Sequence, residues 1–380
     1  MRPVKLSLFT EVQCPPGTSP ERRFDELLEQ AALADRLGYH ALWLSEIHFQ
    51  PEFSALAAPY VVLGAVAART RRLRLGVAVN VLPVHHPLQV AEQAATLDVL
   101  SHGRLEFAMG RGHVHSRVYE GYGVERARSR ALQEESLRVI LAAWTEDRLE
   151  WHGEHYQVPG VVVNPKPLQR PHPPIHVAAT SRESVEEAAG RGYNLFVPAH
   201  LLPRAELRAY AAAYWEGLRA HGHDPAAREL GLLLPVHLAD STEQAREEAR
   251  EGFLDYYRVI QEVRLDYERW PARQGPEGPP RAVREPMTFE RLCAEAAILG
   301  DPATALAALR ALLEETGATQ VLCWMNMGSI AHPLVLRSLE QFARELMPRL
   351  LRGASRGWCE PAAHTSPCRG RRRRGASPRC

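Results

Sequence analysis

The chain alternates short apolar runs with longer stretches in which apolar residues recur every three or four positions. The short runs are β-rich, alternating or continuously apolar, as strands are. They are residues 5–9, 41–45, 73–81, 105–109, 175–179, 194–197, 231–238 and 320–325. Helical periodicity between these runs predicts repeated βα units, although Pro235 weakens the seventh strand because proline cannot donate a ladder hydrogen bond.

Start and stop signals delimit the helices. Ser19 followed by Pro20 is a helix start, and Gly38 is a helix end. Ser181 and Ser241 are further N-cap candidates. The other predicted helices cover residues 55–70, 87–100, 129–144, 203–220, 301–316 and 333–350. Residues 146–174 form a polar, proline-rich connection, and residues 268–287 a loop-rich insertion.

Eight strands, each followed by a helix, predict a single (β/α)₈ TIM barrel over residues 1–350. A doubly wound open sheet is the alternative. No GxGxxG motif opens a helix after the first strand, and this argues against a Rossmann dinucleotide site.

Composition is that of a soluble globular enzyme, with 45% hydrophobic and 24% charged residues among 380. The six cysteines have no paired spacing, so we expect neither a disulfide framework nor a zinc site, and a reducing cytoplasm fits. The sequence shows no signal peptide and no apolar run of membrane-spanning length. We therefore expect a cytoplasmic protein without a membrane partner.

The net charge of +1 hides an asymmetry. Residues 351–380 carry eight arginines and one glutamate, which leaves a net charge near −6 on the first 350 residues. We interpret this tail as a disordered, solvated appendage. The predicted barrel has no basic stripe, so no nucleic-acid partner is expected.

Chemistry in such a barrel lies at the carboxyl ends of the strands. Glu46 and His48 follow the second strand, and burying them requires paired partners. Two adjacent histidines, His85 and His86, follow the third strand between prolines. Such groups handle protons or bind ligands. A structural ion pair is the alternative for Glu46 and His48, and a loop cap is the alternative for His85 and His86.

Two further strand ends suit an anionic ligand. Arg111, after the fourth strand, has glycine on both sides, so the backbone can approach a ligand and the guanidinium can hold a phosphate. Thr180, Ser181 and Ser184 follow the fifth strand at a helix start, where free N–H groups bind anions, although ordinary N-capping is the alternative. Together these residues favour a phosphorylated cofactor.

His113 and His115 follow Arg111 and could suggest a metal pair. No carboxylate at a suitable spacing completes a site, so we expect no metal.

Taken together, these segments resemble the bacterial luciferase-like flavin-dependent oxidoreductases. The matching segments keep their order along the chain and include Trp43-Leu-Ser-Glu-Ile-His-Phe, Ala58-Pro-Tyr, Leu82-Pro-Val-His-His-Pro-Leu, Leu97-Asp-Val-Leu-Ser-His-Gly-Arg, Gly110-Arg-Gly and Asn326-Met-Gly-Ser-Ile-Ala-His-Pro.

The resemblance implies that the strand ends hold reduced FMN or the deazaflavin F420. It implies that the flavin phosphate lies near Arg111 and the hydroxyl-bearing turn, and that the peptide between Ala78 and Val79 is cis. The cofactor-binding residues expected on this basis are Glu46, Ala78, Val79, Asn80, Arg111, Thr180, Ser181 and Ser184.

Two positions depart from luciferase itself. Ile47 stands where luciferase has the histidine that serves the aldehyde reaction, and Gly110 stands where it has a reactive cysteine. Aldehyde-dependent light emission is therefore not expected. The acid/base candidates are His48, ranked first by position, then His86, His113 and His115.

The working hypothesis is a monooxygenase. Reduced FMN from a separate flavin reductase would react with O₂, and the resulting peroxyflavin would oxygenate a small organic substrate, in a homodimer like those of relatives. F420-dependent hydride transfer is one alternative, and a non-catalytic flavin-binding partner subunit is another. Substrate identity depends on loops that vary freely on a barrel.

Overall fold

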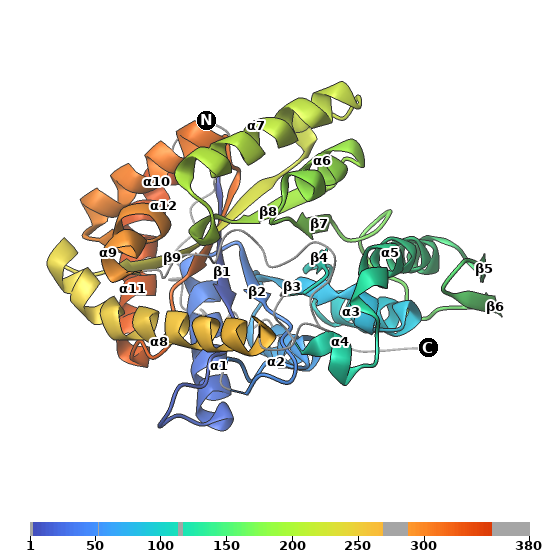
Figure 1. Cartoon of the computed structure of the whole chain (residues 1–380), viewed down its shortest axis with the longest axis horizontal. Helices are drawn as coiled ribbons and strands as arrows, with labels where there is room; N and C mark the ends of the chain where they lie inside the picture. The colour runs from blue at the N-terminus through green and yellow to red at the C-terminus, as the bar shows by residue number, and fades with distance from the viewer. Residues whose placement is uncertain (1–2, 52, 113–116, 269–287, 352–380) are drawn as a thin grey trace, which may run out of the picture.

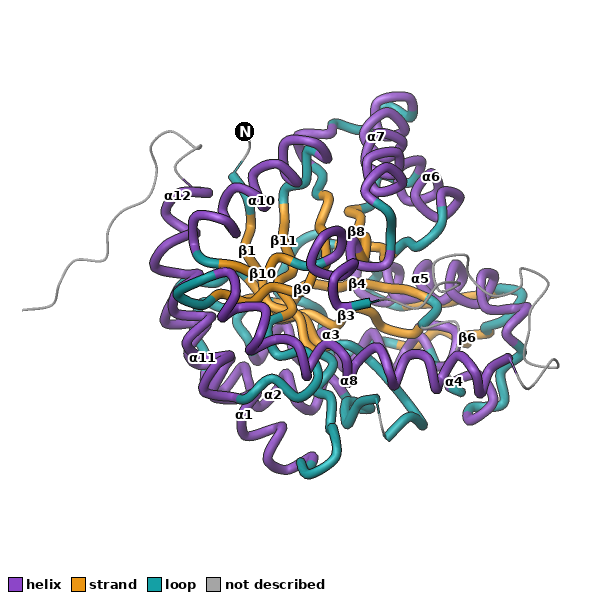
Figure 2. The backbone as a smooth tube through the Cα atoms, turned by 60° about the vertical axis from the view of Figure 1, so that its left-hand side comes forward, coloured by secondary structure: helices purple, strands orange, loops and turns teal. Residues whose placement is uncertain are grey.

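The structure is a computed structural model that describes residues 3–51, 53–112, 117–268 and 288–351. Eight parallel strands close into a barrel surrounded by helices, as Figure 1 and Figure 2 show. In order around the barrel they are β1 (Lys5–Thr10), β2 (Ala41–Leu44), β3 (Arg74–Val81), β4 (Leu105–Gly110), β7 (Ile175–Ala178), β8 (Asn194–Pro198), β9 (Leu230–Leu238) and β11 (Gln320–Trp324). The predicted TIM barrel is confirmed.

The helices cover the outside of the barrel. They are α1 (Pro20–Leu37), α2 (Pro59–Arg69), α3 (Pro87–Leu100), α4 (Val118–Gly121), α5 (Ser129–Thr145), α6 (Arg182–Gly190), α7 (Arg204–Ala220), α8 (Thr242–Glu268), α9 (Phe289–Arg291), α10 (Pro302–Thr316), α11 (His332–Gln341) and α12 (Met347–Leu351). Short π-helical turns follow α9 and α11. No helix in the described ranges is long and apolar enough to cross a bilayer.

The cap signals act as the sequence predicts at α1. The Ser19 side chain accepts a hydrogen bond from the Arg22 N–H, and Gly38 ends the helix at φ 85°. Helix α2 begins later than predicted, at Pro59 rather than near residue 55. Ala58 precedes that proline, and a residue before proline is disfavoured in helical conformation.

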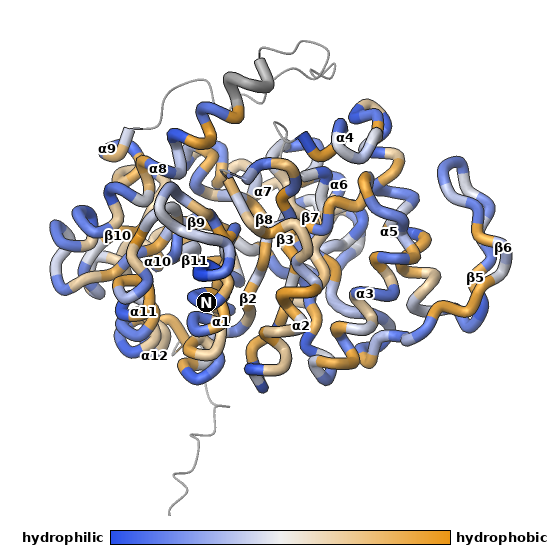
Figure 3. Tube along the Cα trace, turned by 90° about the horizontal axis from the view of Figure 1, so that it is seen from below, coloured by the Kyte–Doolittle hydropathy of each residue, from blue (hydrophilic) through white to orange (hydrophobic). Residues whose placement is uncertain are grey.

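The barrel interior is filled by large side chains. Trp43 is fully buried and meets the rings of His176 and Phe196 edge-on, at centroid distances of 5.2 and 4.7 Å. Gly76 on the neighbouring strand makes room for this indole, because a Cβ there would stand 2.3 Å from the ring. Figure 3 shows apolar residues following the strands and the inner faces of the helices.

A buried ionic network lies near the amino-terminal ends of β3, β4 and β7. His176 Nε2 is 2.8 Å from Glu106 Oε2, and the Arg74 guanidinium contacts Glu106 Oε1. Arg74 also donates to Gln169 Oε1 at 2.9 Å. Burial alone would raise the pKa of Glu106, but the hydrogen bond from His176 and the nearby cations lower it to about 2.

Two elements depart from the sequence prediction. The connection expected over residues 146–174 contains an antiparallel hairpin, β5 (Leu149–His152) and β6 (Gln157–Val161), which projects beside α5 in Figures 1 and 3. A ninth parallel strand, β10 (Ile298–Gly300), pairs only with the end of β9. The predicted insertion, apart from its first residue, and residues 352–380 of the tail lie outside the described residues.

Candidate active site at the carboxyl ends of the strands

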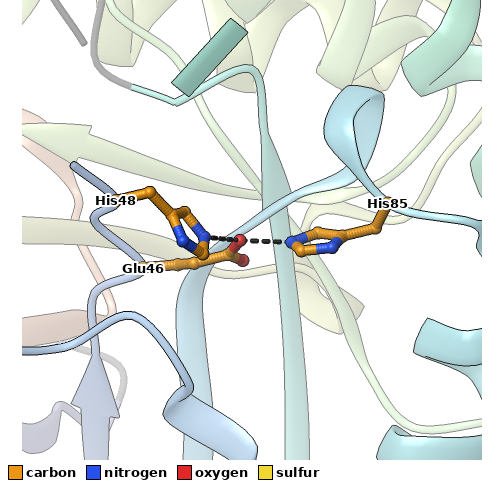
Figure 4. Close-up of side chains that lie close together, drawn as sticks. All are labelled: Glu46, His48 and His85. Atoms are coloured by element: carbon orange, nitrogen blue, oxygen red, sulfur yellow. Dashed lines mark hydrogen bonds and ion pairs between the residues drawn. The ribbon is translucent and has the colours of Figure 1, made fainter. Parts of the chain in front are cut away.

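One carboxylate gathers two histidines beyond the ends of β2 and β3 (Figure 4). His48 Nε2 lies 2.8 Å from Glu46 Oε1, and His85 Nε2 contacts the same oxygen. The backbone N–H of Val81 donates to Glu46 Oε2 at 3.0 Å. Glu46 is 8% exposed and His48 6% exposed, so the partners replace the water that both side chains lose.

The pKa values of Glu46 and His85 are shifted in opposite directions in this cluster. Burial by itself would raise the pKa of Glu46, but hydrogen bonds from His48 and His85 lower it to about 2. Burial would lower the pKa of His85, but the hydrogen bond to Glu46 raises it. Glu46 is therefore a carboxylate at neutral pH, and His85 holds a proton more readily than an ordinary histidine.

The cluster borders a small cavity of about 130 Å³. Asn80 lines it from β3, and Tyr122 lines it from the end of α4. Asn80 is buried and donates to the carbonyl of Ala108 at 2.8 Å. The Tyr122 hydroxyl lies 3.3 Å from His48 Nδ1. The lining of this cavity therefore includes a hydroxyl, an amide, a carboxylate and two imidazoles.

A second cavity, of about 160 Å³, lies between the ends of β4 and β7. Arg111, Thr180 and Ser184 all line it. Val79 lines it from β3, whereas its neighbour Asn80 lines the first cavity. The two cavities therefore lie on either side of the end of β3.

The second cavity is rich in arginine. Arg126, Arg130 and Arg191 line it together with Arg111, against the two glutamates Glu134 and Glu187. The glutamates pair with lining arginines, since Arg130 lies 3.0 Å from Glu187 and Arg191 lies 3.2 Å from Glu134. The lining has more cationic than anionic groups, so it suits an anionic ligand.

The residues of the hydroxyl-bearing turn do not all line the second cavity. Ser181 does not line the cavity. Its Oγ accepts a hydrogen bond from the Ser184 N–H at 3.3 Å and caps α6, and such N-capping was the alternative role for this residue.

The peptide between Ala78 and Val79 is cis, as the family resemblance implied. The register between β3 and β4 shifts between Val77 and Asn80, so the strand is irregular beside both cavities.

Of the other histidine candidates, the structure describes His86, which does not join the Glu46 cluster. His86 is exposed, and its Nδ1 accepts from the Leu88 N–H at 3.3 Å as the cap of α3. Its neighbour His85 contacts Glu46 instead, and the acid/base role of His86 stays a prediction. His113 and His115 lie outside the described residues.

Sequence reasoning missed Tyr122 and Arg130. Arg130 stands at the second position of a correctly predicted helix, and its place beside Arg111 depends on how that helix packs. Tyr122 follows a helix of only four residues, which leaves no periodic signal. Neither residue carries a local motif that would have marked it.

The Glu46 cluster also meets a geometric requirement for metal binding. One ligand atom from each of Glu46, His48 and His85 lies within 4.8 Å of the others. The hydrogen bonds from both Nε2 atoms to one carboxylate oxygen account for the same arrangement without an ion. The geometry alone therefore does not require a metal.

Curated relatives share much of this sequence. The oxygenase component of the flavin-dependent trigonelline monooxygenase of Acinetobacter baylyi is 32% identical over 67% of this chain and 71% of its own. The 4-hydroxyprotoasukamycin monooxygenase of Streptomyces nodosus subsp. asukaensis is 28% identical over 94% of this chain and 96% of its own.

Solved structures share the fold. The monooxygenase RslO1 of Streptomyces bottropensis superposes with a TM-score of 0.78 at 27% identity, over 91% of this chain and 99% of its own. The oxygenating constituent of the 3,6-diketocamphane monooxygenase of Pseudomonas putida, solved with FMN, gives 0.75 at 21% identity over the same shares. An F420-dependent secondary alcohol dehydrogenase gives 0.70 at 16% identity over 92% and 99%.

The family model described as luciferase-like monooxygenase matches residues 4–320, which include every strand of the barrel except the last four residues of β11. The match covers both cavities and the Glu46 cluster. The chain belongs to the luciferase-like monooxygenase family.

Proposed function

We propose that this chain is the oxygenase component of a two-component system. Reduced FMN arrives from a separate flavin reductase, and one oxygen atom of O₂ enters a small organic substrate. The family supports oxygen incorporation. The name "oxygenase component" of the trigonelline relative and the FMN complex of the diketocamphane enzyme support the reductase and the cofactor.

The observation that carries the cofactor proposal is the cavity shared by Arg111, Thr180 and Ser184. A flavin phosphate carries negative charge and accepts several hydrogen bonds. The Arg111 guanidinium and the two hydroxyls supply donors, and the start of α6 adds the favourable end of a helix dipole. The residues present fit the phosphate of FMN.

The reduced flavin supplies the electrons that activate O₂. The chain supplies position and proton control. Val79 and the irregular end of β3 lie between the two cavities, so Arg111 would hold the flavin phosphate on one side of this strand end, and His48 lies on the other. His48 then serves as the acid/base, oriented through Nε2 by Glu46.

The test compares two ligands that differ only by the phosphate. Wild-type protein should bind reduced FMN more tightly than reduced riboflavin, under anaerobic conditions. Arg111→Ala should weaken FMN binding by about 30-fold, since a charged hydrogen-bond donor contributes about 2 kcal/mol. Riboflavin binding should stay the same.

Arg182→Ala is the matched control. Arg182 begins α6 beside the same turn, but it pairs with Glu186 at 2.7 Å and does not line the cavity. Its removal should leave the preference for FMN intact. An Arg111→Ala protein that still prefers FMN to riboflavin as strongly as wild type would remove the phosphate role.

The cofactor alternative is F420, which also has an anionic tail and would support hydride transfer without O₂. The absorbance of the copurified cofactor separates the two flavins. Oxygen uptake coupled to product formation separates the monooxygenase from both hydride transfer and a non-catalytic subunit. The homodimer stays a prediction, and light scattering in solution tests it.

A further inference from the structure

His85 reaches the active-site carboxylate from a different element than His48. Glu46 and His48 directly follow β2, whereas His85 follows the short 3₁₀ turn Leu82–Val84 beyond β3. Ile47, between Glu46 and His48, has no side-chain group that could pair with the carboxylate. A second histidine thus contacts Glu46 from the neighbouring strand end, facing His48 across the shared oxygen in Figure 4.

The directions of the hydrogen bonds follow from the chemistry of the groups. A carboxylate only accepts, so both Nε2 atoms that face Glu46 Oε1 carry hydrogen. In neutral His48 this leaves a lone pair on Nδ1. The Tyr122 hydroxyl, 3.3 Å away, donates to it. The nitrogen available for chemistry is therefore Nδ1, and a hydroxyl already lies against it.

We propose that His85 is a positioning residue that sets the proton affinity of His48 through their shared carboxylate, Glu46. Tyr122 holds His48 Nδ1 until a substrate group replaces its hydroxyl. The inference rests on the proposed function, in which His48 is the acid/base. Nδ1 takes a proton from the substrate and returns it to the oxygen atom that leaves as water, so His48 ends each turnover unchanged.

Charge explains why His85 matters. The directions of the pKa shifts favour a charged pair, with Glu46 ionised and His85 protonated, so Glu46 is already neutralised before His48 binds a proton. Among the described residues that line this cavity, the other titratable groups are Tyr60 from α2 and Tyr122 at the end of α4, and both hydroxyls are neutral because burial raises each pKa. Removing the charge of His85 leaves Glu46 to attract a proton on His48 alone.

The test is His85→Gln, which keeps a donor but removes the charge. ¹⁵N-histidine NMR on the full chain without cofactor should show the His48 titration midpoint moving up by about one pH unit. The acidic limb of the kcat profile should move in the same direction by a similar amount, with the KM for reduced FMN unchanged. Retained dispersion of the histidine signals shows that the variant is folded, because the histidines of an unfolded chain all titrate near the ordinary value.

His86→Gln is the matched control, one residue along and outside the cluster. It should move neither the midpoint nor the limb. Tyr122→Phe is a second variant on an exposed residue, and it should change the ¹⁵N shift of His48 Nδ1 without changing that of Nε2.

The coupling between His85 and His48 and the proposed function can fail separately. An unchanged His48 midpoint in His85→Gln would overturn the coupling even in an active enzyme. A shifted midpoint in a protein that takes up no O₂ with reduced FMN and candidate substrates would uphold the coupling and count against the proposed function. An unaltered Nδ1 signal in Tyr122→Phe would overturn the role of Tyr122.

Discussion

Gly110 and Val79 lie so close that the glycine has no room for a side chain. A Cβ on Gly110 would stand 2.6 Å from Cγ2 and 3.3 Å from Cβ of Val79. Both residues line the second cavity, the one that contains Arg111. Val79 therefore fills the space that a side chain at position 110 would need.

Replacing Gly110 with alanine should displace Val79 and distort the cavity. We expect a loss of about 1–3 kcal/mol in the free energy of unfolding, the usual cost of overpacking, together with weaker FMN binding. Chemical denaturation and flavin titration measure the two effects. Gly64→Ala is the control, because Gly64 lies inside α2 with no atom within 4 Å of the added Cβ. That change should leave stability equal or raise it by up to about 1 kcal/mol.

Glu46→Gln should cost activity without unfolding the protein. An amide presents only one acceptor atom and adds donors that face the histidine N–H groups, so the required tautomer of His48 is no longer enforced. We expect turnover to fall roughly 10²- to 10⁴-fold. Steady-state oxygen uptake measures it, and Glu92→Gln on the exposed face of α3 gives the same charge change as a control. Equal activity in the two variants would rule out the orienting role of Glu46.

The Glu106 network predicts an acid-sensitive barrel. Its folded pKa of about 2 lies below the unfolded value of about 4.3, so its contribution is present above roughly pH 5 and is lost as the pH falls toward 2. The contribution is on the order of 3 kcal/mol. Glu106→Gln should flatten the dependence of the unfolding free energy on pH in that window. Glu247→Gln, at an exposed position, should leave the slope as it is in wild type.

Glu135 should hold the projecting hairpin. Its carboxylate accepts from the N–H groups of His155 and Tyr156 at 2.9 and 3.0 Å and from Trp151 Nε1 at 3.1 Å. Glu135→Ala leaves these donors without their acceptor, and we expect a loss of about 1–3 kcal/mol. Hydrogen exchange should accelerate across β5 and β6. Glu154→Ala, at an exposed position on the same hairpin, should not accelerate it.

The barrel was predictable because each strand is buried and apolar along its own length. The hairpin was not, because the acceptor that anchors it, Glu135, belongs to a helix that precedes it in the chain. The three residues of β10 form a strand only by pairing with β9. These are tertiary contacts, and the local periodicity of the sequence does not predict them.

The candidate site shows the same division. Glu46, His48 and Arg111 could be named as candidates from the sequence because polar groups follow apolar strands. The sequence does not tell which of the two adjacent histidines contacts Glu46, because this depends on the path of the 3₁₀ turn that precedes them. In the structure, His85 makes the contact.

The pair of Glu106 and His176 lies near the starts of the strands, whereas Glu46 and Arg111 follow their ends. Changes to loops at the carboxyl ends of the strands leave that pair in place. A laboratory seeking a new substrate range can therefore vary the segment beyond β8, which carries neither Glu46, His48 nor Arg111, and screen for turnover without first repairing the scaffold.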